Sequence, residues 1–208
     1  MNGAKVQNRG IDHYFASEHN FCQLFSEAIG ELNELHWAPL KIIQMSARFL
    51  AYKPGVRILD IGSGPGKFCL AGAYYQPEAL FFGVEQRQYL VDEGMMANEA
   101  LGGLAVDLLC KNFTQLNFGE FDAFFFYNSF FENLPGAGKI DETLSYSKEL
   151  YDYYSYYLNR KFSVMPAGTR IVTYCSWEDE IPSGYRAVET HMDGLLKFWI
   201  REPGSQNP

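Results

Sequence analysis

The sequence lacks the features that would place it in a membrane or in an oxidising compartment. Its four cysteines are spread over 208 residues without paired spacing (Cys22, Cys69, Cys110 and Cys175), which predicts buried free thiols and no disulfide framework. No apolar run approaches the roughly 20 residues that a membrane helix needs, and residues 1–9 contain no apolar signal core. We therefore expect a cytoplasmic protein that does not span a membrane.

Positive charge and metal-ligand patterns are also scarce. The 17 Lys and Arg residues stand against 25 Asp and Glu residues, a net charge of −8. Because phosphate backbones bind through Lys and Arg, this balance argues against nucleic acid as a partner. The four histidines show no clustered or H-E-x-x-H spacing, so no metal site is predicted. Aromatic residues, by contrast, are abundant at 16%. This predicts a ring-rich core and a pocket with aromatic walls.

The periodicity of the apolar residues alternates between helix and strand. Helices are expected at residues 11–35, 40–50, 66–75, 86–98 and 141–162. Strands are expected at residues 56–61, 80–85, 104–110, 122–127 and 170–175, followed by a hairpin of 185–192 and 195–202 around a two-residue turn. This order predicts an α/β fold: a doubly wound, mostly parallel seven-stranded sheet with helices on both faces and an antiparallel hairpin at its C-terminal end. Six tyrosines between residues 146 and 157 are expected on amphipathic helix positions, with each hydroxyl in water.

A glycine-rich loop follows the first predicted strand. In parallel sheets the ligand lies beyond the carboxyl ends of the strands, and this loop lies at such an end and leads into a helix start. Its third glycine comes one residue too early for a dinucleotide fingerprint. Asp60, at the strand end, would repel a pyrophosphate but accept hydrogen bonds from an ammonium group. The loop residues with a predicted ligand role are Gly62, Ser63, Gly64 and Gly66.

The second predicted strand ends on an acid. Glu85 stands at the position from which a carboxylate accepts hydrogen bonds from both ribose hydroxyls of a nucleoside. We assign the next residue, Gln86, to the same site. Loop and acid together indicate a nucleoside ligand that carries positive charge.

These residues resemble the class I S-adenosylmethionine-dependent methyltransferases. The resemblance covers about residues 56–202 and is best at residues 58–66. It implies a Rossmann-like methyltransferase fold and S-adenosylmethionine as cofactor, with Asp60 and the loop backbone at the methionine part and Glu85 at the ribose. Asn112 and Phe113 occupy the place beside the adenine where many members carry a polar residue. The implied domains are a helical cap at 1–50, a cofactor-binding methyltransferase domain at 51–202 and a disordered tail at 203–208.

Polar residues also follow the fourth predicted strand. Asn128 is placed to accept a hydrogen bond from an acceptor nitrogen and aim its lone pair at the methyl group, and we group Tyr127 with it as catalytic. Phe130 and Phe131 are expected to wall the acceptor site. The segment resembles the Asn-Pro-Pro-aromatic signature of methyltransferases that act on nitrogen, with Ser129 in place of the first Pro. It also resembles the Asn-containing strand end of the non-SET histone lysine methyltransferases.

The remaining expectations concern the acceptor. Tyr14 and Trp37 of the cap are expected to contact it, and His13 or His36 is the candidate for a catalytic base. The sequence favours N-methylation of a small molecule or a protein side chain. O-methylation of a small molecule and a non-catalytic S-adenosylmethionine-binding module remain open alternatives, and a nicotinamide oxidoreductase would need the other glycine spacing. The acceptor and the oligomeric state are not specified by the sequence.

Overall fold

A mixed sheet forms the centre of the molecule in the computed structural model, which describes residues 10–204. Its strands are β1 (Arg57–Ile61), β2 (Leu80–Glu85), β3 (Val106–Cys110), β4 (Ala123–Phe126), β5 (Arg170–Tyr174), β6 (Tyr185–His191) and β7 (Leu196–Arg201). In the described residues the spatial order is β3-β2-β1-β4-β5-β7-β6. The first five strands pair in parallel, and β7 pairs antiparallel with both β5 and β6. This confirms the predicted fold class.

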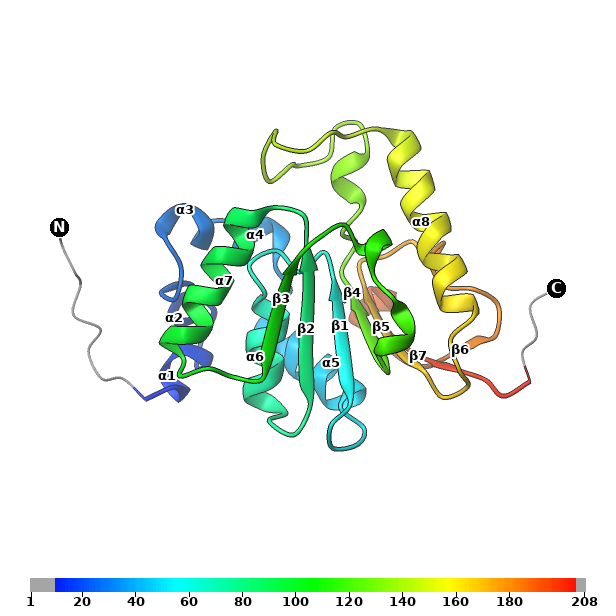
Figure 1. The fold of residues 1–208 in the computed structure, drawn as a ribbon, viewed down its shortest axis with the longest axis horizontal. Helices are drawn as coiled ribbons and strands as arrows, with labels where there is room; N and C mark the ends of the chain where they lie inside the picture. The colour runs from blue at the N-terminus through cyan, green and yellow to red at the C-terminus, as the bar shows by residue number, and fades with distance from the viewer. Residues whose placement is uncertain (1–9, 205–208) are drawn as a thin grey trace.

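Helices cover both faces of the sheet (Figure 1). On one face lie α5 (Leu40–Leu50), α6 (Lys67–Tyr75) and α7 (Gln88–Ala100), and on the other lies α8 (Lys148–Ser163). Because side chains alternate across a strand, neighbouring residues of one strand serve opposite cores: Ile58 packs with the first group of helices, and Leu59 packs with α8.

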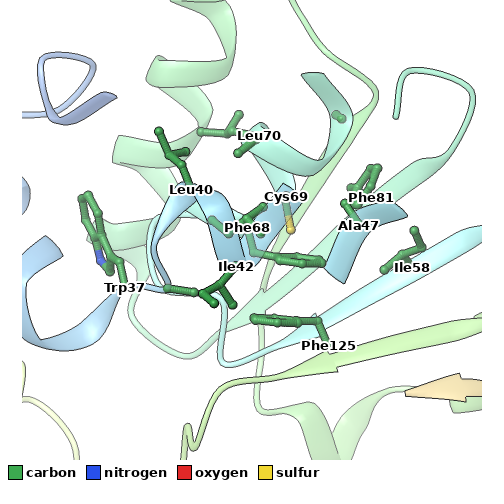
Figure 2. Close-up of a cluster of buried hydrophobic side chains, with 14 of the residues drawn as sticks. Trp37, Leu40, Ile42, Ala47, Ile58, Phe68, Cys69, Leu70, Phe81 and Phe125 are labelled. Carbon is green, nitrogen blue, oxygen red and sulfur yellow. The ribbon is translucent and has the colours of Figure 1, made fainter. Parts of the chain in front are cut away.

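Aromatic rings fill both cores, as the composition predicts. In the first core, the rings of Phe68 and Phe125 stack at 4.0 Å between centroids, and Figure 2 shows them among aliphatic side chains, with Trp37 at the edge of the cluster. In the second core, Phe124 packs against Phe118 and Phe162. Burying both sides of the central strands in this way explains why their sequences are continuous apolar runs.

The strand register brings four strand ends to one edge of the sheet. Ile61 of β1 pairs with Val84 of β2 and with Phe126 of β4, and Phe126 in turn pairs with Thr173 of β5. The residues that follow β1, β2, β4 and β5 therefore emerge side by side. They lie at the upper end of the sheet in Figure 1, where the segment before α8 also lies.

The single helix expected at residues 11–35 is wrong. The chain forms four short helices there: α1 (Asp12–Phe15), α2 (Glu18–Cys22), α3 (Glu27–Gly30) and α4 (Asn33–His36). Ser17 and Ser26 are the cause, because both take extended backbone torsions and begin new helices. The Ser17 side chain accepts a hydrogen bond from the amide of Asn20 at 3.1 Å, which is the N-cap interaction that favours serine at such positions.

Other boundaries also differ from the expectations. α8 begins at Lys148, not at 141, because Ser147 caps it by accepting the amide of Leu150. The hairpin turn is a three-residue 3-10 turn, η4 (Met192–Gly194), with positive φ at Met192 and Asp193. Three more 3-10 turns occur among the described residues: η1 (Phe113–Gln115), η2 (Phe118–Glu120) and η3 (Phe131–Asn133).

The remaining sequence expectations have mixed outcomes. No helix in residues 10–204 is long and apolar enough to cross a membrane. The four thiols are free, but only that of Cys69 is fully buried. Of the expected disordered tail, residues 205–208 lie outside the described part, and residues 203–204 form a turn. The helices α1 and α2 share the first core with α5 and α6, and the division of the chain near residue 50 stays a prediction.

Candidate active site

A cavity of about 550 Å³ opens at the carboxyl edge of the sheet. Most of the predicted site residues line it: Trp37, Asp60, Gly62, Ser63, Gly64, Glu85, Gln86, Phe113, Tyr127, Asn128, Phe130 and Phe131. Gly66, Asn112 and Tyr14 do not line it. The volume lies within the range of about 300–1,000 Å³ that is usual for small-molecule sites.

The glycine loop is fixed from two sides. The amides of Gly62 and Ser63 donate to the carbonyl oxygen of Val84 at 2.9 and 3.0 Å, which holds the loop against β2. Gly62 has φ of +75°, and a Cβ at this position would lie 2.4 Å from Cβ of Ser129. Only glycine fits this combination of torsion and contact. Gly66 contributes by its conformation, since it begins α6 in the left-handed region without lining the cavity.

Asp60 is a buried carboxylate that faces the cavity. It is 5% exposed, and no described residue forms an ion pair or a side-chain hydrogen bond with it. Burial, and secondly the charge of Glu85, raise the pKa of Asp60 well above its usual value. A cationic ligand group would relieve both effects, because it would restore a favourable environment for the ionised carboxylate.

Glu85 has one oxygen engaged and the other directed at the loop. Its Oε1 accepts from the amides of Gln86 and Arg87 at 2.8 and 3.0 Å and from Nη1 of Arg87 at 3.2 Å. Its Oε2 accepts from the amide of Gly64 at 3.3 Å. A carboxylate oxygen can accept more than one hydrogen bond, so Oε2 retains capacity for a ligand donor.

Arg87 connects this acid to a distant part of the chain. Residues 131–147, which run from the end of β4 to α8 and which we call the strap, supply three of its partners. Nη2 of Arg87 lies 2.7 Å from Oε2 of Glu132 and 2.8 Å from the hydroxyl of Tyr146. Nε lies 3.2 Å from Oδ2 of Asp141, although without hydrogen-bond geometry.

Arg87 is the buried cation at the centre of this network. The Arg87 side chain is 4% exposed. Burial by itself lowers its pKa, but the charges of Glu85, Glu132 and Asp141 together raise it overall. Burial likewise opposes ionisation of Asp141, but hydrogen bonds from Tyr89 and from Thr143, together with the Arg87 charge, lower the pKa of Asp141 to about 2. The strap is therefore held to the end of β2 partly by the opposite charges of Arg87 and Asp141.

The residues after β4 combine strain with a tie to the loop. Asn128 has φ of +42°, an uncommon conformation for a non-glycine residue that is found preferentially at functional sites. No described residue hydrogen-bonds the Asn128 side chain. The hydroxyl of Ser129 donates to the carbonyl oxygen of Ile61, which joins the exit of β4 to the exit of β1. Burial raises the pKa of Tyr127 to about 12, so that its phenol stays protonated at neutral pH.

Asn112 is placed behind the cavity wall. Its Nδ2 donates to Oε1 of Gln86 and to the hydroxyl of Tyr154, both at 2.8 Å, and its Oδ1 caps η1. The neighbouring Phe113 does line the cavity, and its ring stacks on that of Phe130 at 5.0 Å between centroids. Asn112 is thus arranged to position Gln86, while Phe113 offers a ring edge to a ligand.

Of the expected cap residues, Trp37 and His36 line the cavity, and Tyr14 and His13 do not. Tyr14 packs against the first core and contacts the ring of His13, away from the cavity. His13 lies near the Asn20 side chain and also does not line it. His36 does line the cavity, and burial lowers its pKa, so it is a neutral imidazole near pH 7.

The sequence analysis missed several charged or polar cavity residues, among them Lys67, Arg87, Glu132 and Tyr146. Tyr146 was expected on a helix with its hydroxyl in water, which is wrong, because it precedes α8 and its hydroxyl binds Arg87. Of these residues, only Arg87 could have been suspected from the sequence, because it is a charged residue two positions after Glu85.

Comparisons with known proteins agree with this geometry. Residues 54–130 match the sequence model of a family described as "Putative methyltransferase". A comparison with curated protein sequences finds no match.

Solved structures share the fold at low sequence identity. An RNA methyltransferase from Salinibacter ruber, in complex with S-adenosyl-L-homocysteine, is 16% identical with a TM-score of 0.58 over 83% of this chain and 96% of its own. The magnesium protoporphyrin IX methyltransferase ChlM from Synechocystis PCC 6803, with bound SAM, is 14% identical with a TM-score of 0.57 over 96% of this chain and 100% of its own. TrmN from Thermus thermophilus is 16% identical with a TM-score of 0.56 over 83% of this chain, which spans 51% of the TrmN chain.

The partial family match and the shared fold agree with the resemblance to class I S-adenosylmethionine-dependent methyltransferases that the glycine loop and Glu85 predicted. They do not specify the acceptor, because the similar structures include methyltransferases of RNA and of a porphyrin.

Proposed function

We propose that this chain transfers a methyl group from S-adenosylmethionine to a nitrogen atom of a small molecule or of a protein side chain. The observation that carries the proposal is that a single cavity is lined by Asp60, by Glu85 and by Asn128. These are the residues that cofactor binding at two points and acceptor orientation would require.

The cavity suits the cofactor chemically. Asp60 is a buried carboxylate without a cation partner, which fits an ammonium group. Oε2 of Glu85 has acceptor capacity for ribose hydroxyls. Phe113, stacked on Phe130, gives an aromatic surface for a purine. Asp60, the loop from Gly62, Glu85, Gln86 and Phe113 would hold the cofactor, and Asn112 would position Gln86.

When bound, S-adenosylmethionine supplies a methyl group on a positively charged sulfur. The protein's task is then alignment and exclusion of water, since transfer is an in-line displacement. The side-chain oxygen of Asn128 accepts an N–H of the acceptor and directs its lone pair into the cavity. Phe130 is 4% exposed and, together with Phe131, walls the acceptor site.

An N-methyl acceptor agrees with the groups present. A neutral amine needs no strong base, and Asn128 offers orientation without removing a proton. The net charge of −8 disfavours nucleic acid as acceptor, although two of the similar structures are the Salinibacter RNA methyltransferase and TrmN. Ser129 was the only support for a non-catalytic module, and its hydroxyl has a packing role at Ile61.

O-methylation is the second candidate, and His36 favours it. A hydroxyl acceptor must lose its proton, and a neutral imidazole in the cavity is a suitable general base. The two candidates differ in their response to His36→Gln. This substitution should abolish transfer to oxygen but leave transfer to an amine with most of its rate.

The proposal is tested in two stages. Isothermal titration of the purified protein with S-adenosylmethionine and with NAD should show binding of the first alone. Tritiated S-adenosylmethionine is then incubated with the protein and with separate small-molecule and protein fractions of a cell extract. Labelled product should form with wild type and not with Asn128→Gly, a change that tolerates the positive φ.

Each stage has a result that contradicts the proposal. Absence of S-adenosylmethionine binding would refute the cofactor. Binding with no labelled product in any fraction would favour the non-catalytic module. Equal label with wild type and Asn128→Gly would remove Asn128 from the mechanism.

A further inference from the structure

The indole of Trp37 is buried with an unused hydrogen-bond donor. Trp37 is 7% exposed, and its Nε1 has no partner among the described residues. Buried donors are nearly always paired, because an unpaired one loses its hydrogen bonds to water without replacement. An unpaired donor in a cavity wall therefore indicates a missing ligand acceptor.

The unused donor lies beside the glycine loop. A Cβ built on Gly64 would be 3.9 Å from Nε1 of Trp37, and both residues line the cavity. Trp37 ends α4 in an extended conformation immediately before α5, and its ring packs against Phe25 at 5.1 Å. The indole is thus held by the cap helices and placed against the loop, at the edge of the buried cluster that Figure 2 shows.

A buried ammonium group lies close to the same indole. Nζ of Lys67 is 5.8 Å from the Trp37 ring centroid, and Lys67 is 2% exposed and lines the cavity. Its ammonium donates to Glu18 and to Asn33, which accounts for two of its three protons. Lys67 is also the first residue of α6, a helix end where free amides and the helix dipole favour an anion.

We propose that Trp37 and Lys67 form the subsite for the α-carboxylate of the methionine part of S-adenosylmethionine, with the indole Nε1–H as a direct donor. The inference rests on the function proposed above. It gives the cavity two opposite partners for one amino-acid group: Asp60 for the ammonium and Trp37 with Lys67 for the carboxylate.

The charges in the cavity favour this ligand group over a phosphate. Asp60 and Glu85 line the same cavity and would repel a multiply charged anion. A carboxylate carries one negative charge and, in an amino acid, is adjacent to a positive group. The buried acid Asp60 and the buried base Lys67 line a single cavity, an arrangement that fits such a zwitterion.

The test compares two ligands that differ by the group in question. S-adenosylhomocysteine carries the amino-acid part, and 5′-methylthioadenosine lacks it. Trp37→Phe keeps an aromatic ring in the core and removes the donor. Because a hydrogen bond to a charged group is worth about 1.5–3 kcal/mol, Trp37→Phe should weaken S-adenosylhomocysteine about tenfold or more. Its affinity for 5′-methylthioadenosine should change less than about twofold. Trp177→Phe, at a residue that is 62% exposed, is the control and should change neither affinity.

A second readout observes the donor itself. In protein labelled with 15N-tryptophan, the Nε1–H resonance that is lost in Trp37→Phe should shift downfield with S-adenosylhomocysteine. The same resonance should move little with 5′-methylthioadenosine.

The outcomes separate this inference from the proposed function. If wild type binds neither ligand, the proposed function fails, and this inference fails with it. If wild type binds both and Trp37→Phe weakens them equally, or weakens neither, the carboxylate subsite alone is refuted.

Discussion

Replacing Arg87 by methionine tests whether buried charge holds the strap over the cavity. Methionine replaces the aliphatic stem of Arg87 with an unbranched apolar side chain but carries no charge. The carboxylates of Glu85, Glu132 and Asp141 therefore lose their shared cation. Their side chains are 6%, 16% and 20% exposed. Removing one partner of a buried ion pair typically costs about 3–5 kcal/mol. We expect Arg87→Met to lower the free energy of unfolding by that amount.

The measurement is urea denaturation followed by circular dichroism. With a denaturant slope of about 2 kcal/mol per molar urea, the midpoint should fall by about 1.5–2.5 M. Arg186→Met is the matched control, because Arg186 also pairs with a glutamate, Glu202, but the two side chains are 64% and 51% exposed. Exposed pairs contribute about 0–1 kcal/mol, so this midpoint should move by less than about 0.5 M.

Acid provides a second signature of the same network. The destabilisation by Arg87→Met arises from unpaired negative charge, so it should shrink as the pH falls and Asp141 becomes protonated. Limited proteolysis at neutral pH should cut Arg87→Met first within residues 131–147. Equal midpoint shifts for Arg87→Met and Arg186→Met would refute the idea that this network stabilises the fold, and an unchanged cleavage pattern would refute its role in holding the strap.

Three further predictions concern the cavity and the network. Glu85→Gln should weaken S-adenosylmethionine binding at least about tenfold in calorimetry, because it removes a charge-assisted acceptor for the ribose; wild-type affinity would contradict this role. Gly62→Ala should destabilise by about 1–3 kcal/mol, since its Cβ would lie 2.4 Å from that of Ser129, and adding Ser129→Gly should recover part of the loss in thermal unfolding. Asp141→Asn should lower the free energy of unfolding at neutral pH. Hydrogen bonds and the Arg87 charge, against the effect of burial, lower the pKa of Asp141 in the folded protein to about 2. The contribution of Asp141 to stability is therefore complete above its ordinary pKa and is lost as the pH falls through 2. The stabilities of wild type and Asp141→Asn should therefore converge in acid, and a difference that persists at pH 2 would contradict the assignment.

The parts of the site that are local in sequence could be predicted from it. The loop at residues 62–66 and Glu85 each follow a buried strand directly, and parallel pairing brings strand ends to one edge whatever the rest of the chain does. Asn128 follows from the same argument. The strand boundaries differ from the predicted ones by at most a few residues, because continuous apolar runs identify central strands.

Contacts between distant segments could not be predicted. Arg87 meets Glu132 and Tyr146 at sequence separations of 45 and 59 residues, and no periodicity relates such residues. Tyr14 and Trp37 were both expected at the acceptor, but the breaks at Ser17 and Ser26 turn the cap so that Tyr14 packs on the core while Trp37 reaches the glycine loop. Ser17 was a helix N-cap signal in the sequence, but the apolar spacing of residues 11–35 was given more weight and predicted one helix.

Ser129 shows why a departure from a family pattern is not evidence for lost activity. A proline at this position has no hydroxyl with which to reach the carbonyl oxygen of Ile61, whereas the Ser129 side chain donates to it. Gly62 must lack a side chain because Ser129 occupies that space, so the two residues are fitted to one another. The position of the glycine loop is thereby fixed relative to the exit of β4, one residue from Asn128. A substitution at either member should consequently disturb cofactor binding and acceptor orientation together, which separates these two residues from Asn128, where orientation alone should change.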